Sequence, residues 1–118
     1  MIVHLEILGL TTLVIPEGRL DFGTAPGFQA HVEQALAGAT TAPAVVIIDC
    51  ARLEYVSSAG LRVFLLAART AQRTERSLAL CALTPAVREV FEVSGFSRLV
   101  AVHADRATAL AQAPQGSA

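Results

Sequence analysis

The chain has 118 residues, of which 53% are hydrophobic, and its formal net charge at pH 7 is −1. This length suits one domain with a single core, and the near-neutral charge argues against nucleic acid as the main partner. No apolar run approaches the roughly 20 residues of a membrane helix and no signal peptide is evident, so we expect a cytoplasmic protein without a membrane partner.

The first third of the chain predicts a strand pair followed by a helix. Apolar and polar residues alternate over residues 2–8, which is typical of a half-exposed strand. After a turn, residues 12–16 form a second strand, so the two make an antiparallel hairpin. Residues 17–24 are interpreted as a loop. The spacing of apolar residues over 25–37 then predicts an amphipathic helix.

The rest of the chain alternates between strands and helices. The uninterrupted apolar run at 44–49 predicts a central strand covered on both faces. The elements expected after it are a helix at 59–74, a strand at 78–83, a helix from Thr84 to Gly95, a strand at 99–102 and a helix at 105–113. This order predicts an α/β domain over residues 1–113, with a mixed, mostly parallel sheet and about four helices. Residues 114–118 are expected to be a flexible C-terminal tail.

Two adjacent hydroxyls mark the start of the second predicted helix. Ser57 or Ser58 is the natural N-cap, since a serine oxygen can accept from a free backbone N–H of the first turn. The positive end of a helix dipole also stabilises a phosphate, so the same position suits a modification site. An ordinary cap is the alternative. Strand ends of a parallel sheet meet at one edge, which brings Asp21 and Thr24 near these serines.

The sequence offers no positive evidence for catalysis or for a cofactor or metal site. Its glycines match neither a phosphate-binding loop nor a dinucleotide fingerprint, and a Gly-x-Ser-x-Gly elbow is lacking. His4, His31 and His103 fall in three different elements, which argues against a ligand cluster. Cys50 and Cys81 end two predicted core strands without a CxxC motif, so we expect packed, reduced thiols.

Three segments together resemble one known family. Residues 48–61, with the sequence IDCARLEYVSSAGL, resemble the signature of STAS domains, specifically those of bacterial anti-sigma factor antagonists. Residues 83–96, LTPAVREVFEVSGF, are similar to the second signature of that family. Residues 18–25 are similar to its first loop, Gly-x-Leu-Asp followed by Thr-Ala. The segments occur in the family's order and span essentially the whole chain, which implies a STAS-like single domain.

The resemblance also assigns residues to a site. The serine that is phosphorylated in the family aligns with Ser58, and Ser57, which stands where the family usually has aspartate, is a rival acceptor. Asp21 matches an acidic residue near the phosphorylation loop, whereas Arg19 stands where glutamate is frequent. The partner-binding residues implied in this way are Asp21, Thr24, Ser57, Ser58, Ala59 and Gly60.

The resemblance implies a partner switch that regulates transcription, rather than an enzyme. The unmodified domain binds an anti-sigma factor that is also a serine kinase, and so releases the sigma factor. A phosphate on Ser58 blocks binding, and a metal-dependent serine phosphatase of the PP2C type resets the switch. Two alternatives remain open. One is a STAS subunit of a lipid-transport or stressosome assembly that acts as a non-phosphorylated binding module. The other is an enzyme or nucleotide-binding protein.

Overall fold

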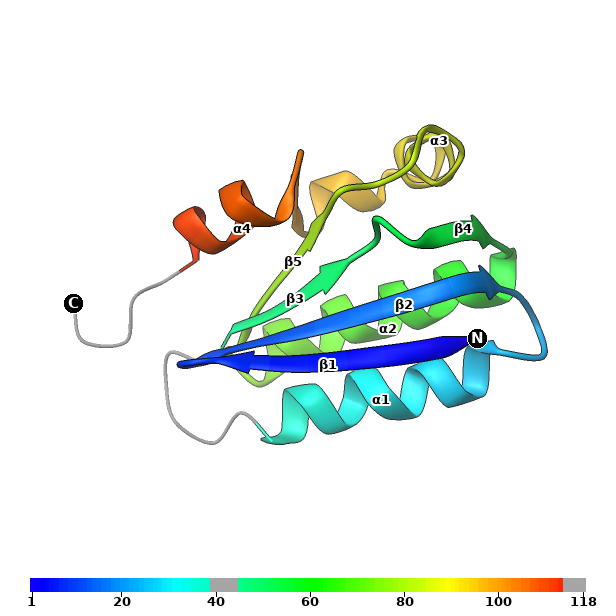
Figure 1. The fold of residues 1–118 in the computed structure, drawn as a ribbon. Coiled ribbons are helices and arrows are strands. Elements are labelled where there is room, and N and C mark those ends of the chain that lie inside the picture. The colour runs from blue at the N-terminus through cyan, green and yellow to red at the C-terminus, as the bar shows by residue number, and fades with distance from the viewer. Residues whose placement is uncertain (39–44, 114–118) are drawn as a thin grey trace.

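The structure is a computed structural model that describes residues 1–38 and 45–113 (Figure 1). One sheet runs in the order β1-β2-β3-β5-β6, and β4 pairs with the far end of β2. The elements, in chain order, are β1 (Ile2–Leu8), β2 (Thr11–Leu20), α1 (Ala25–Gly38), β3 (Val45–Asp49), β4 (Leu53–Val56), α2 (Ser58–Arg73), β5 (Ser77–Cys81), α3 (Pro85–Ser94), the 3-10 turn η1 (Phe96–Arg98), β6 (Ala101–His103) and α4 (Arg106–Gln112).

The sheet is mixed, as the element order predicts. β1 and β2 are antiparallel, whereas β2, β3, β5 and β6 are parallel neighbours. α1 and α2 lie on one face and α4 lies on the other (Figure 1). The expected α/β class, hairpin and four helices are therefore confirmed. Position 44 of the predicted central strand and the predicted tail at 114–118 lie outside the described residues.

The larger of two apolar cores lies under α1, α2 and α3 and is centred on phenylalanine rings. Phe64 of α2 lies 5.4 Å from Phe28, 5.0 Å from Phe91 and 6.0 Å from Phe96, measured between ring centroids. Burial of such rings contributes much of the apolar area of a small domain, and tilted pairs add to it. This cluster fixes α2 against its neighbours, and α2 carries the two candidate serines at its start.

The prediction of a loop over 17–24 is wrong in its first half, because β2 continues to Leu20. β4, which the sequence analysis missed, pairs in parallel with this extension, with a register shift at Gly18 and Arg19. Gly18 has φ +109°, which few other residues adopt, and its N–H donates to the carbonyl of Arg52 at 3.0 Å. The positive φ lets β2 bend, so that it pairs with β3 near its start and with β4 near its end.

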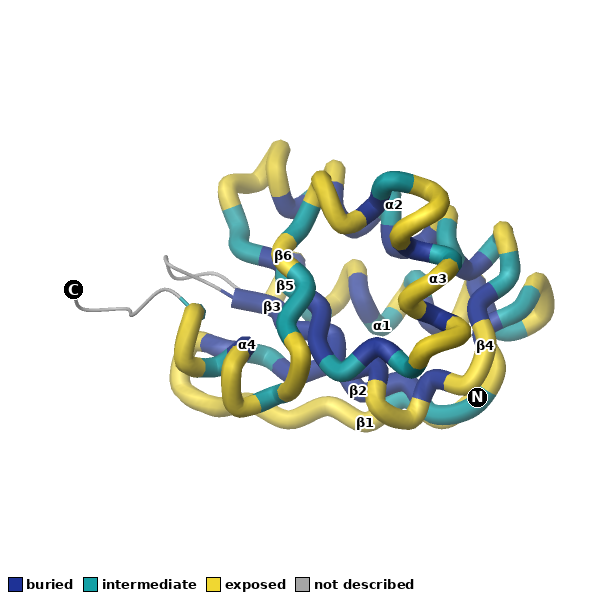
Figure 2. The backbone as a smooth tube through the Cα atoms, turned by 90° about the horizontal axis from the view of Figure 1, so that it is seen from above, coloured by how far each residue is buried: buried dark blue, intermediate teal, exposed yellow. Residues whose placement is uncertain are grey.

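β1 is more exposed than its alternating pattern predicts. The apolar residues Ile2, Leu5, Ile7 and Leu8 are all exposed, and only Val3 of this strand is partly buried. Figure 2 shows β1 as exposed along nearly its whole length. The reason is its place at the sheet edge, since α1 packs chiefly against α2 and β2 rather than against β1.

We expect both cysteines to resist thiol reagents until the protein unfolds. Cys50 and Cys81 are buried and unbonded to each other, and burial raises the pKa of the Cys81 thiol to about 12. Because the thiolate is the reactive form, a chromogenic disulfide reagent at pH 8 should modify neither residue in the native protein and both in denaturant. Rapid modification of the native protein would contradict this burial.

The raised pKa of Cys81 also determines how this thiol affects the stability of the protein as the pH changes. Below the ordinary thiol value of 9.0 both folded and unfolded states keep the proton, so this contribution to stability is intact. As the pH rises from there toward 12, the unfolded chain ionises first, and the contribution is lost.

Candidate functional site

Ser57 is the N-cap of α2. Its backbone is extended, with φ −83° and ψ 174°, and its hydroxyl oxygen accepts from the N–H of Gly60 at 3.2 Å. The Ser57 carbonyl accepts the first helical bond, from the N–H of Leu61 at 2.8 Å. The sequence left the cap open between two serines, and the geometry assigns it to Ser57.

Ser58 is the first residue of α2, and it is exposed. Since its neighbour supplies the cap, the Ser58 side chain lies at the positive end of a 16-residue helix without a capping role. The expectation that Ser58 lies exposed at the helix start is confirmed. A group added to this hydroxyl extends into solvent and displaces no core side chain.

The end of β2 packs directly against this helix start. The N–H of Ser57 donates to the carbonyl of Leu20 at 2.8 Å. Gly60 is buried, and a Cβ built on it would lie 2.6 Å from Cγ of Leu20. A glycine is therefore required for the two elements to approach this closely. Asp21 directly follows Leu20 in the chain. The contact between Leu20 and Ser57 therefore holds the start of the Asp21 loop close to Ser57.

Asp21 and Thr24 form a compact turn before α1. One carboxylate oxygen of Asp21 accepts from the N–H groups of Gly23, at 3.0 Å, and Thr24, at 3.1 Å. The Thr24 hydroxyl donates to the carbonyl of Arg19 at 2.9 Å. The backbone N–H of Thr24 is the main cause of a lowered pKa at Asp21, which is therefore ionised at neutral pH. These contacts give both residues a role in shaping the loop.

Two features of this end of the molecule were missed by the sequence analysis. Phe22, between Asp21 and Gly23, is 85% exposed, which is unusual for a phenylalanine. The guanidinium of Arg19 lies 4.2 Å from the ring centroid of Tyr55, within the range of a cation–π contact. Phe22 lies in the predicted loop, where no sequence pattern reports whether a side chain is exposed. The pair of Arg19 and Tyr55 depends on β4, which the sequence pattern did not reveal.

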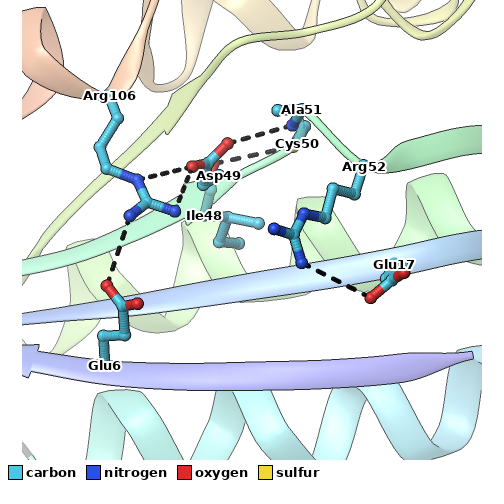
Figure 3. A network of polar contacts seen from close by, with 8 residues as sticks. All are labelled: Glu6, Glu17, Ile48, Asp49, Cys50, Ala51, Arg52 and Arg106. Carbon is cyan, nitrogen blue, oxygen red and sulfur yellow. Dashed lines mark hydrogen bonds and ion pairs between the residues drawn. The ribbon is translucent and has the colours of Figure 1, made fainter.

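Asp49, the aspartate of the first signature, serves the fold rather than the serine site (Figure 3). It is only 4% exposed, and one carboxylate oxygen accepts from two nitrogens of Arg106, both at 2.8 Å. The other oxygen accepts from the N–H of Ala51 at 3.0 Å. Arg106 also reaches Glu6 of β1 at 3.3 Å. The network links α4 to β3 and to β1 across one face of the sheet.

Neither a membrane span nor a metal cluster occurs in the described ranges, 1–38 and 45–113. Within them, no helix combines the length and the apolar character that crossing a bilayer takes. The same ranges contain no group of three or more histidine, cysteine, aspartate or glutamate side chains placed to hold a metal ion.

The mixed sheet and the exposed Ser58 at the start of α2 agree with the resemblance of the sequence to STAS domains. The model of the STAS domain family matches residues 3–109, and the chain belongs to this family. A curated relative from Bordetella bronchiseptica, named as the anti-sigma factor antagonist BtrV, is 50% identical over 66 residues. That match covers 56% of this chain and 57% of the relative, so it spans little more than half of either.

Solved structures show the same fold at low sequence identity. An anti-sigma factor antagonist from Thermotoga maritima superposes with a TM-score of 0.84 at 16% identity, over 93% of this chain and 92% of that one. The Bacillus cell fate determinant SpoIIAA, solved in its phosphorylated form, gives a TM-score of 0.70 at 24% identity, over 94% and 98% of the two chains. Identities this low support the fold alone.

Proposed function

We propose that this chain is a cytoplasmic anti-sigma factor antagonist that works by partner switching. In its unmodified form it binds an anti-sigma factor with serine kinase activity, and phosphorylation of Ser58 ends that binding. A phosphatase of the PP2C type restores the unmodified form. The observation that carries the proposal is the exposed Ser58 hydroxyl at the first position of α2, with the cap supplied by Ser57. The antagonist named among the relatives supports it.

The physical effect of a phosphate at this position is local. It adds about −1.5 to −2 charges and three acceptor oxygens to a surface that a partner must desolvate. The free N–H groups of the first turn and the helix dipole accommodate that charge, so the domain does not need to refold. A loss of about 1.4 kcal/mol already lowers the affinity tenfold. A small electrostatic and steric change is therefore sufficient for a switch.

The proposed partner surface consists of side chains with different roles. Ser58 and Phe22 are exposed and are the residues that a partner touches directly. An exposed phenylalanine is a typical binding anchor, and hydrogen bonds to Asp21 hold the backbone of the turn that carries it. Asp21 and Thr24 hold that turn, and buried Gly60 sets the approach of the two elements. Ala59 lies beside the acceptor on the first turn of α2.

Phosphosite mapping after incubation with the cognate kinase and ATP tests the proposal. We expect the label on Ser58, and we expect Ser57→Ala to leave phosphorylation largely intact. Label on Ser57 would move the switch by one residue. No label on either serine would favour the alternative, a non-phosphorylated STAS subunit of another assembly. Nucleotide hydrolysis by the protein alone would instead indicate an enzyme.

A further inference from the structure

We propose that two copies of this chain pair through the free edge of β1, antiparallel and about a two-fold axis, to form a dimer with one continuous sheet. β1 is a seven-residue edge strand paired with β2 over its whole length without a register shift. Alternate residues of such a strand direct N–H and C=O groups away from the sheet. A second strand can satisfy these groups.

The edge has few of the features that usually prevent strand addition, and its one carboxylate, Glu6, is paired with Arg106 at 3.3 Å. Natural sheets protect their edges with lysine, proline, a bulge, a very short strand or a covering helix. Residues 2–8 contain neither lysine nor proline, and no bulge interrupts β1. β6, the opposite edge strand, has only three residues. Of the two edges, β1 is therefore the one open to pairing.

The exposed apolar side chains of β1 favour a strand of similar character. Ile7 is 76% exposed, Ile2 59% and Leu5 49%. Leu5 lies opposite Val14 of β2, on the same face as the larger core. α1 packs chiefly on α2 and β2, and Leu5 and Ile7 of β1 remain exposed on this face. The face beside β1 is consequently open to the side chains of an added strand.

The sequence of β1 selects one register for self-pairing. A two-fold axis through Leu5 places Leu5 opposite its own copy, Val3 opposite Ile7 and Ile2 opposite Leu8, so these cross-strand pairs are apolar. The remaining pair sets His4 of one copy opposite Glu6 of the other, a base against an acid. Residues that lie opposite each other on adjacent strands must point to the same face of the sheet. The two-fold axis must therefore pass through a residue of β1, and the two neighbouring registers are centred on His4 and on Glu6.

The two neighbouring registers are less favourable for a definite reason. Centring the axis on His4 sets two histidines against each other, and centring it on Glu6 sets two carboxylates against each other. Two like-charged carboxylates directly opposite destabilise an antiparallel pair, and the register centred on His4 sets Glu6 opposite the apolar Ile2. The register centred on Leu5 avoids both and joins His4, which already contacts Glu17 at 2.8 Å, to the acid of the second copy. The three apolar pairs and the pairing of His4 with Glu6 in this register thus favour a second copy of this chain as the partner.

Sedimentation of the whole chain tests the dimer. We expect a mass of twice the 12.4 kDa protomer for the unaltered protein, and the protomer mass for Leu5→Lys, in which two lysines oppose each other at the axis. Val93→Lys is the matched control, since Val93 of α3 is 84% exposed and lies outside β1. It should remain dimeric, and circular dichroism should show both variants folded. A monomer at every concentration, or a dimer that persists in Leu5→Lys, would overturn the proposal.

Cysteine crosslinking tests the register. Under oxidised glutathione, Leu5→Cys should form a disulfide between copies, because its Cβ faces its own counterpart across the axis. Ile7→Cys is the control, since position 7 lies opposite Val3 and far from the cysteine introduced in the second copy. The buried native thiols do not compete. Faster crosslinking of Ile7→Cys would refute the register.

The proposed dimer and the serine switch can fail independently of each other. The dimer interface is formed by β1 and does not include the start of α2, where Ser58 lies. Ser58→Glu should therefore leave the sedimenting mass unchanged, whatever the outcome of phosphosite mapping. A loss of the dimer in this variant would contradict an interface confined to β1.

Discussion

Ser58→Glu should weaken binding of the anti-sigma factor by about tenfold or more, whereas Ser58→Ala should retain both the fold and the binding. A carboxylate at this position places negative charge on the partner surface, and a tenfold loss corresponds to about 1.4 kcal/mol. The effect should be smaller than that of a phosphate, which carries more charge and more acceptor oxygens. Alanine removes a hydroxyl that does not cap the helix, since Ser57 does so. Calorimetric titration of each variant with the partner measures both effects.

Ser57→Ala is the control that separates the two serines. It removes the acceptor for the Gly60 N–H, which should lower the free energy of unfolding by about 1 kcal/mol. It leaves the Ser58 hydroxyl in place, so binding and phosphorylation should change little. If Ser58→Glu binds the partner as tightly as the unaltered protein, a charge-based switch at this residue is wrong.

Gly60→Ala should be the most damaging small substitution at the site, with a loss of about 2 to 3 kcal/mol in the free energy of unfolding. The new methyl group would lie 2.6 Å from Cγ and 3.0 Å from the carbonyl oxygen of Leu20. Leu20 is fully buried, so its side chain cannot move away freely, and overpacking of this kind typically costs about 1 to 3 kcal/mol. Denaturant unfolding monitored by circular dichroism measures the change.

Gly27→Ala is the matched control for that experiment. Gly27 also lies in the first turn of a helix, but a Cβ built on it has no atom within 4 Å. Alanine there should raise stability by about 0.5 to 1 kcal/mol, because glycine is a poor helix former. Equal effects of the two substitutions would show that helix propensity, rather than the contact with Leu20, determines the outcome at position 60.

The elements with a strong local pattern could be predicted from the sequence. The apolar run at 45–48 and the helical spacing after Leu61 identified β3 and α2, and proline and glycine placed the ends of α3 correctly, at Pro85 and before Gly95. β4 has no such pattern, because only two of its four residues are buried and it depends on a partner strand 35 positions earlier in the chain. Its pairing with β2 arises from tertiary structure, which local periodicity does not report.

The site was predictable to a similar degree. The helix start and the exposure of Ser58 followed from the change in periodicity, but the choice of Ser57 as cap depends on backbone dihedrals that two adjacent serines do not reveal. The closeness of the β2 end to Ser57 was expected from sheet topology, and the contact between Leu20 and Ser57 supports it. Phe22 was not singled out, because side-chain exposure in an irregular loop has no sequence pattern.

The contact of Asp49 with Arg106 has a consequence for synthesis on the ribosome. The two residues are 57 positions apart, and Glu6, which shares the arginine, is 100 positions from it. The chain is made from its N-terminus, so β1, β2 and β3 emerge well before the only cation that neutralises the buried Asp49 in the described structure. Until then the carboxylate favours a hydrated environment, which opposes closure of that face of the sheet. Translation of α4 is therefore the step at which the nascent domain can complete its second core.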